Sequence, residues 1–148
     1  DGKPFPAKYD RRHDISIVLT YKFSERFDAS LTWVYATGNA ATLALQQFDP
    51  EPEPSEESEY YYYYQASADY VSSRNNYRMP AYHRMDISLN WHKDLRFGKG
   101  TINVSVYNLY NRQNPYMLYT ETTYSGNRSL NQLSLFPFLP SVSYIWTF

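Results

Sequence analysis

The sequence contains no cysteine and only five glycines in 148 residues. The absence of cysteine excludes a disulfide scaffold and any cysteine-based metal or thiol site. Acidic and basic residues nearly balance, with a formal net charge of -1, so charge gives no argument for nucleic acid or an anionic lipid surface. No apolar run approaches the roughly 18 residues of a transmembrane helix. Membrane-spanning strands are not excluded, because their alternating side chains give a weak hydropathy signal.

Aromatic side chains are abundant: they make up 19% of the chain, with 17 tyrosines, 8 phenylalanines and 3 tryptophans. The length suits one domain. The sequence opens at Asp1 without an initiator methionine or a signal peptide, so we interpret it as a piece of a longer protein or a matured product.

Alternation of apolar and polar residues predicts an all-β, antiparallel fold. Between Asp14 and Ser24 the apolar residues fall on odd positions, from Ile15 to Phe23, and Lys22 lies on the other face. No segment shows a convincing helical period of about 3.6 residues. The predicted strands lie near residues 14–24, 27–37, 82–93, 100–110 and 133–148.

The predicted connections alternate between short and long. Few residues join the first two strands around Glu25, and residues 93–100 form a compact turn. The polar, Tyr-rich and Asn-rich segments 38–80 and 111–131 are expected to be outer loops. This alternation is typical of an up-and-down outer-membrane barrel, with short periplasmic turns and long outer loops.

The aromatic residues favour the same interpretation, because Tyr and Trp collect where an apolar barrel surface meets the lipid headgroups. Two belts are predicted. Near the short turns lie Phe23, Phe27, Trp91, Phe97, Trp146 and Phe148, and near the long loops lie Tyr35, Tyr82, Tyr110 and Phe138.

About five strands cannot close a barrel, since the smallest outer-membrane barrels have about eight. The remaining strands could come from upstream sequence, another chain or symmetric copies of this one, and we favour upstream sequence. Polar residues facing the lumen are expected to line the barrel wall: Lys22, Asp86, Asn90 and Asn103.

Three blocks of sequence resemble, in the same order, the C-terminal barrel of TonB-dependent outer-membrane receptors. They are LTWVYATGN at 31–39 with Thr42 and Leu43, NYRMPAYHRMD at 76–86, and VYNLYNRQNPY at 106–116. The resemblance is closest to receptors that carry a carboxypeptidase regulatory domain, and it spans essentially the whole chain. The final alternation, with Tyr144, Trp146 and Phe148, is similar to the signal read by the barrel-assembly machinery.

The resemblance implies a transmembrane β-barrel of about 22 strands, of which this chain supplies the last five or so, in the bacterial cell outer membrane. Such a receptor imports a scarce nutrient of the glycan, peptide, siderophore or cobalamin class with energy delivered by TonB. The implied partners are the rest of the barrel and its plug, TonB through an N-terminal part, the lipid bilayer and the barrel-assembly machinery. The resemblance also allows a surface lipoprotein as a partner, and no nucleic acid partner is expected.

One outer loop carries the candidate substrate contacts. Tyr60, Tyr61, Tyr62, Tyr63 and Tyr64 follow an acidic, proline-rich run at 49–59. The tyrosine rings could stack on a sugar or peptide ligand. The acids match no EF-hand, so we expect no metal ion and no cofactor.

No catalytic constellation stands out, and we expect no enzymatic activity. Ser88, His92 and Asp86 share one predicted strand face, but alternate residues on a strand lie about 6.6 Å apart, too far for direct hydrogen bonds. The histidines show no zinc-ligand spacing. Two alternatives to a transporter remain: a passive pore or structural outer-membrane barrel, and a soluble, aromatic-rich ligand-binding β module.

Overall fold

A computed structural model describes residues 2, 4–44, 46–48, 68–123 and 128–148. All helices and strands counted together, these residues form β-strands alone. Every strand pairing among them is antiparallel, which confirms the predicted all-β class. No helix in this described part is long and apolar enough to span a membrane. The chain divides into two compact units, residues 11–38 with 79–148, and residues 1–10 with 39–78.

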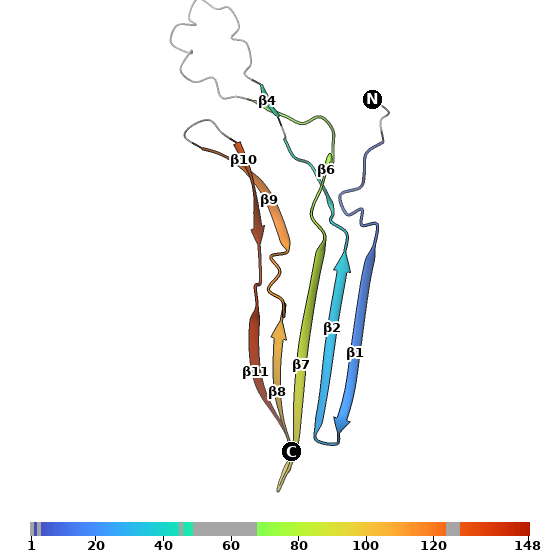
Figure 1. Ribbon diagram of the computed structural model, residues 1–148, viewed down its shortest axis with the longest axis vertical. Coiled ribbons are helices and arrows are strands. Elements are labelled where there is room, and N and C mark those ends of the chain that lie inside the picture. The colour runs from blue at the N-terminus through green and yellow to red at the C-terminus, as the bar shows by residue number, and fades with distance from the viewer. Residues whose placement is uncertain (1, 3, 45, 49–67, 124–127) are drawn as a thin grey trace, which may run out of the picture. The chain divides into compact units, whose positions relative to one another are not determined.

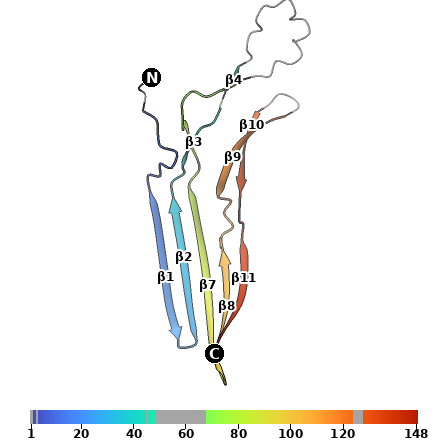
Figure 2. The ribbon, with the colours of Figure 1, turned by 180° about the vertical axis from the view of Figure 1, so that it is seen from behind.

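The larger unit contains a five-stranded sheet in which each long strand lies beside the next one along the chain (Figure 1). Its strands, in spatial order, are β1 (Asp14–Ser24), β2 (Phe27–Ala36), β7 (Tyr82–Leu95), β8 (Gly98–Tyr107) and β11 (Leu139–Thr147). β1 and β11 form the two edges, as Figure 2 shows from behind. The sheet is the antiparallel meander that the sequence pattern predicted.

The strand register keeps apolar residues opposite apolar ones. Leu19 of β1 pairs with Leu31 of β2, which pairs with Ile87 of β7. Because side chains alternate faces along a strand, one face of the sheet is apolar and the other is mainly polar, with Val18 and Ile145 among its few apolar members. No described element packs extensively on either face. Leu19 is therefore 58% exposed and Val142 73% exposed.

Both short turns lie at the end of the sheet where the chain finishes, which we call the turn end (Figure 1). Glu25 and Arg26 connect β1 to β2, and Arg96 and Phe97 connect β7 to β8. The second turn needs Gly98, whose φ of 102° is a conformation that L side chains rarely adopt. The opposite end of the sheet, where the long connections begin, is called the loop end.

The structure differs from the predicted strand limits at the loop end. β8 stops at Tyr107 rather than 110, because Asn108 adopts a left-handed φ of 55°. The last strand begins at 139 rather than 133, since Phe136 has a φ of 56° and a proline follows it, which together break the extended backbone.

The expected outer loops hold strands of their own. Segment 111–131 contributes most of a separate hairpin, formed by β9 (Pro115–Thr122) and β10 (Arg128–Ser134). In the smaller unit, β3 (Ala40–Ala41) pairs with β6 (Tyr77–Arg78), and β4 (Gln46–Phe48) pairs with β5 (Ala68–Tyr70). The Asn76 side chain donates to the Leu43 carbonyl and accepts from its N–H, both at 2.9 Å, and so continues this pairing.

Gly98→Ala should destabilise the sheet by about 2 kcal/mol or more, because it combines backbone strain with a steric clash. An added Cβ would lie 2.0 Å from the Thr147 carbonyl oxygen of β11. The measurement is the urea midpoint of unfolding. Gly2→Ala is the matched control: Gly2 also has a positive φ, but nothing lies within 4 Å of the position that its Cβ would take. Equal midpoints for the two variants would contradict the close approach of the turn to β11.

Candidate functional site

Polar side chains line up in rows that cross the whole sheet. The register places two such rows side by side on the polar face. One row runs through Lys22, Asp28, Asn90, Asn103 and Ser143, and the next through Thr20, Ser30, Ser88, Ser105 and Ser141. The four residues predicted to line a wall, Lys22, Asp86, Asn90 and Asn103, all lie on this face.

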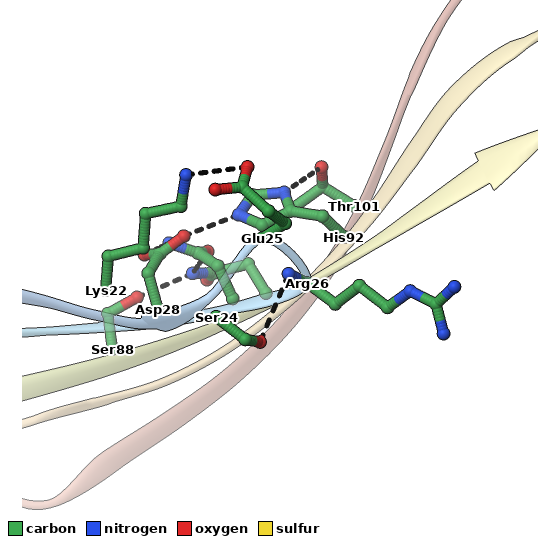
Figure 3. Close-up of polar contacts among 10 residues, drawn as sticks. Lys22, Ser24, Glu25, Arg26, Asp28, Ser88, His92 and Thr101 are labelled. Atoms are coloured by element: carbon green, nitrogen blue, oxygen red, sulfur yellow. Dashed lines mark hydrogen bonds and ion pairs between the residues drawn. The ribbon is translucent and has the colours of Figure 1, made fainter.

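Near the turn end these rows form a hydrogen-bonded cluster, the turn-end network (Figure 3). Its members are Asp28, Ser88, Asn90, His92, Thr101 and Asn103. The hydrogen-bonded pair Lys22 and Glu25 lies beside it, with Lys22 opposite Asp28 in the register. Asn90 donates to the Asp28 carboxylate at 2.8 Å. Asn103 donates to the Asn90 side-chain oxygen at 2.7 Å and to the Ser88 hydroxyl at 2.6 Å. The network therefore ties β2, β7 and β8 together through side chains as well as backbone.

His92 completes the network from a diagonal position on β7. Its Nε2 lies against the Asp28 carboxylate, and its Nδ1 lies 2.9 Å from the Thr101 hydroxyl. A carboxylate only accepts hydrogen bonds, so Nε2 carries a proton; in the neutral tautomer, Nδ1 accepts from Thr101. Asp28 thus receives hydrogen bonds from both Asn90 and His92.

The network is open to solvent rather than enclosed. The His92 side chain is 40% exposed and that of Asp28 is 21% exposed. In the adjoining turn, Lys22 donates a 2.8 Å hydrogen bond to Glu25 and its charge also lies close, which together lower the pKa of the Glu25 carboxyl. This arrangement presents fixed donors and acceptors to water or to a polar partner.

The structure does not bring the candidate catalytic side chains together. Ser88 accepts from Asn103, His92 contacts Asp28, and Asp86 pairs with Arg84. From the sequence, Asp86 was the acid considered together with His92, and the structure places a different acid there. Asp28 is that acid, supplied by the neighbouring strand at a separation of 64 residues.

A second polar cluster lies on the same face at the loop end, around Arg84. Its guanidinium donates to Asp86 and to the Tyr82 hydroxyl, each at 3.0 Å. It also lies 4.0 Å from the ring centroid of Tyr107. Tyr82 therefore belongs to the polar face, and not to an aromatic belt on the apolar face.

Two asparagines continue the support of β7 where β8 has ended. Asn114 is 7% exposed; its side chain accepts from the His83 N–H at 3.0 Å and donates to the His83 carbonyl at 2.9 Å. Asn108 is 1% exposed and donates its own N–H to Asp86 at 2.9 Å. Its side chain binds backbone groups of Arg112 and Phe136. We call Asn108 and Asn114 the asparagine corner; no role for either was predicted from the sequence.

Aromatic rings form a ladder on the apolar face at the loop end. The rings of Trp33 and Tyr35 are stacked with their centroids 6.1 Å apart. The rings of Tyr35 and His83 are stacked with their centroids 6.5 Å apart. His83 Nδ1 lies 2.8 Å from the Tyr110 hydroxyl. Tyr35 and Tyr110 were expected in this belt, and Trp33 and His83 join them.

The remaining predicted site residues divide into two groups. Tyr144 and Trp146 of β11 project from the apolar face, and Phe148 beyond it is 95% exposed. Trp146 donates from Nε1 to the Phe97 carbonyl at 3.0 Å, which ties the final strand to the β7–β8 turn. The five tyrosines at 60–64 lie outside the described residues. Within the described ranges, no group of three acidic or histidine side chains could hold a metal ion.

No protein-family model matches the chain, and neither a curated protein nor a solved structure matches it. Indications of function therefore come from the structure of this chain alone. They are a polar face with a fixed hydrogen-bond pattern, an apolar face that no described element covers, and an aromatic final strand.

Asn114→Ala should lower the free energy of unfolding by about 1–3 kcal/mol, because it leaves the N–H and carbonyl of His83 without their partner. Asn131→Ala is the matched control, since the side-chain amide of this half-buried residue donates, among the described residues, only to side chains of its own hairpin. The measurement is a urea titration of both variants. An equally small change in both would show that the asparagine corner does not support β7.

Proposed function

We propose that the five-stranded sheet is part of the wall of a transmembrane β-barrel in a bacterial outer membrane. The observation that carries the proposal is the uncovered apolar face opposite a hydrogen-bonded polar face. Of the described apolar residues, only Ala36, Ala40 and Leu43 are buried. A water-soluble sheet would place its apolar side chains in a core, which the described residues do not form.

The energetics favour lipid as the medium for this face. Each large apolar side chain left in water forgoes about 1.5–3 kcal/mol of burial free energy. Exposed members of the face occur on several strands, including Leu19, Leu89, Val104 and Val142. A continuous apolar surface of this kind marks contact with a membrane or a partner.

Strand lengths and connections support the same proposal. β2 and β8 have 10 residues and β11 has 9. A tilted strand of about 9–11 residues crosses the hydrocarbon layer. Short turns gather at one end of the sheet and long connections at the other, as in outer-membrane barrels. The aromatic ladder at Trp33 and Tyr35 and the rings at Tyr144 and Trp146 would then lie near the two headgroup regions.

Within this class we propose the C-terminal strands of a TonB-dependent receptor, an importer of a scarce nutrient. The support is the resemblance of three sequence blocks, and these blocks include the loop ends of β2, β7 and β8 together with the asparagine corner. A rigid corner there would hold outer loops in place, and loops on a rigid scaffold commonly carry binding. Transport itself would need the plug and TonB contact that the resemblance implies.

A passive pore is the second candidate, because hydrated polar rows would line an open channel equally well. The two functions are separated with the gene product that carries this chain. Uptake that stops when TonB is deleted, with little conductance in planar bilayers, supports the importer. Steady conductance with TonB-independent uptake supports the pore. Recovery in the aqueous fraction without detergent would contradict both.

Val104→Arg and Ser105→Arg test the two faces at neighbouring positions of one strand. An arginine facing lipid near the middle of the membrane costs about 2–4 kcal/mol, whereas one facing a polar lumen costs little. We expect Val104→Arg to lower the amount of protein assembled in the outer membrane, and Ser105→Arg to leave it near the unsubstituted level. Because Val104 is already exposed in the isolated sheet, equal tolerance of both would favour a soluble module.

Deletion of Phe148 should lower membrane assembly rather than ligand affinity, since the exposed final aromatic residue is proposed as part of the assembly signal. The measurement is the outer-membrane fraction of the protein, followed by ligand binding per assembled molecule. Phe138→Ala, an exposed aromatic outside that signal, serves as the control. Normal assembly with weakened binding would contradict the assignment.

A further inference from the structure

A small pocket opens on the polar face at the loop end, where four segments of the chain meet. They are the start of β7, the end of β8, the start of β9 and the connection from β10 to β11. The lining includes Tyr82, Tyr107, Asn114, Tyr116, Leu135 and Phe136, and the volume is about 160 Å³. Sites for whole drug-sized ligands have about 300–1,000 Å³. This pocket therefore has room for a single ring of a ligand.

Four of the lining side chains are aromatic, and two of these are largely exposed. Tyr116 is 66% exposed and Phe136 is 59% exposed. Phe136 has a φ of 56°, which a bulky residue rarely adopts, and Asn108 donates to its carbonyl at 3.1 Å. The asparagine corner thus holds a strained residue with an uncovered ring beside the pocket. Strained backbone of this kind gathers at ligand sites.

The pocket also has a hydrogen-bond donor in a fixed place. The Arg84 guanidinium donates to the hydroxyl oxygens of both Tyr82 and Tyr107. Each phenol carries an O–H donor of its own. The two hydroxyls are close enough to bond to each other, which uses one of the two O–H groups. Among the described residues no acceptor takes the other, so one O–H is left for an occupant.

The charge of the pocket excludes ionic ligand groups. In the described part of the chain its lining includes no charged side chain. Arg84, which lies behind the two tyrosines, is already paired with the Asp86 carboxylate at 3.0 Å. A carboxylate, phosphate or amine entering here would lose water without gaining an opposite charge. The occupant should therefore be uncharged.

We propose that this pocket binds one uncharged pyranose ring, a single sugar unit of a neutral glycan. The C–H groups on the face of such a ring pack against aromatic faces, which are electron-rich, and its hydroxyl oxygens accept from the remaining phenolic O–H. A purely apolar ring would fill the same volume but displace water from that O–H without replacing the bond.

The inference rests on the proposed function, because it names the chemical class of one part of the nutrient. In the proposed barrel the polar face at the loop end would line the outer mouth of the lumen, where a nutrient enters. A site for one ring there would hold one unit of a longer ligand, and the outer loops would contact the rest.

Saturation-transfer difference NMR tests the ligand class with the gene product that carries this chain, purified in a detergent without a sugar headgroup. The neutral probes are the methyl pyranosides of glucose, galactose and mannose. Methyl glucuronide is the charged comparison, and N-acetylphenylalaninamide offers an uncharged aromatic ring instead.

Two variants remove the exposed rings of the pocket, Tyr116→Ala and Phe136→Ala. Tyr119→Ala is the matched control, because Tyr119 belongs to the same hairpin, is 43% exposed and is not part of the lining. Tyr116→Phe keeps the ring and should bind as the unsubstituted protein does. Phe136→Leu keeps an apolar side chain without an aromatic face, and it gives a second measurement if Phe136→Ala assembles poorly.

We expect saturation transfer to at least one neutral pyranoside. Its Kd should rise about 3–10-fold in Tyr116→Ala and in both Phe136 variants, as expected for the loss of one aromatic contact, and should not change in Tyr119→Ala. No transfer to any of the three pyranosides would overturn the inference. Stronger binding of the glucuronide or of the phenylalaninamide would also overturn it, as would an unchanged Kd in the pocket variants.

Failure of this inference is distinguishable from failure of the proposed function. A detergent-dependent outer-membrane protein that binds none of the pyranosides would leave the barrel standing and remove the sugar site. A water-soluble protein that binds a pyranoside through Tyr116 and Phe136 would keep the sugar site and remove the barrel.

Discussion

The register of the five long strands is the constraint on which the rest of the structure depends. Because side chains alternate at every residue, a slip of one position between two strands would move a whole set of apolar side chains to the other face. The observed pairing keeps Leu19, Leu31 and Ile87 in one row and Asp28, Asn90 and Asn103 in another. The turn-end network adds side-chain bonds that only this register allows, so the polar face itself helps to fix the pairing.

At the loop end a different device replaces strand pairing. β8 ends at Tyr107, while β7 begins at Tyr82 and so extends past it. The exposed backbone of β7 is bonded by Asn114 at His83 and by the Leu109 N–H at the Met85 carbonyl. Asn108 closes the corner in a left-handed conformation, which asparagine tolerates better than most residues. The β7 edge is thus satisfied without a further strand, and the chain is free to leave the sheet.

Much of the sheet could be predicted from the sequence, because a half-apolar strand leaves a period-two pattern that needs no knowledge of its neighbours. The β9–β10 hairpin was missed because it lacks this pattern. Met117, Leu118 and Tyr119 are consecutive, so neither face of β9 is uniformly apolar. The contact between His92 and Asp28 could not be inferred either, since it depends on the register of strands distant in sequence. Asn108 and Asn114 act through backbone geometry, which composition does not reveal.

The difference between the two faces of the sheet also indicates which interactions stabilise it. Hydrogen bonds between strands contribute little net free energy in water, since the unfolded chain bonds to water instead, and a sheet normally gains its stability by burying one face. Here the apolar face of β1, β8 and β11 is exposed, and no strand among the described residues pairs with the outer edge of β1 or of β11. In hydrocarbon the relative weight of these two contributions is reversed: the apolar face needs no protein cover, and an unmade backbone hydrogen bond costs several kcal/mol. In the proposed barrel, a sheet with this pattern would be stabilised by lipid and by neighbouring strands more than by any core of its own.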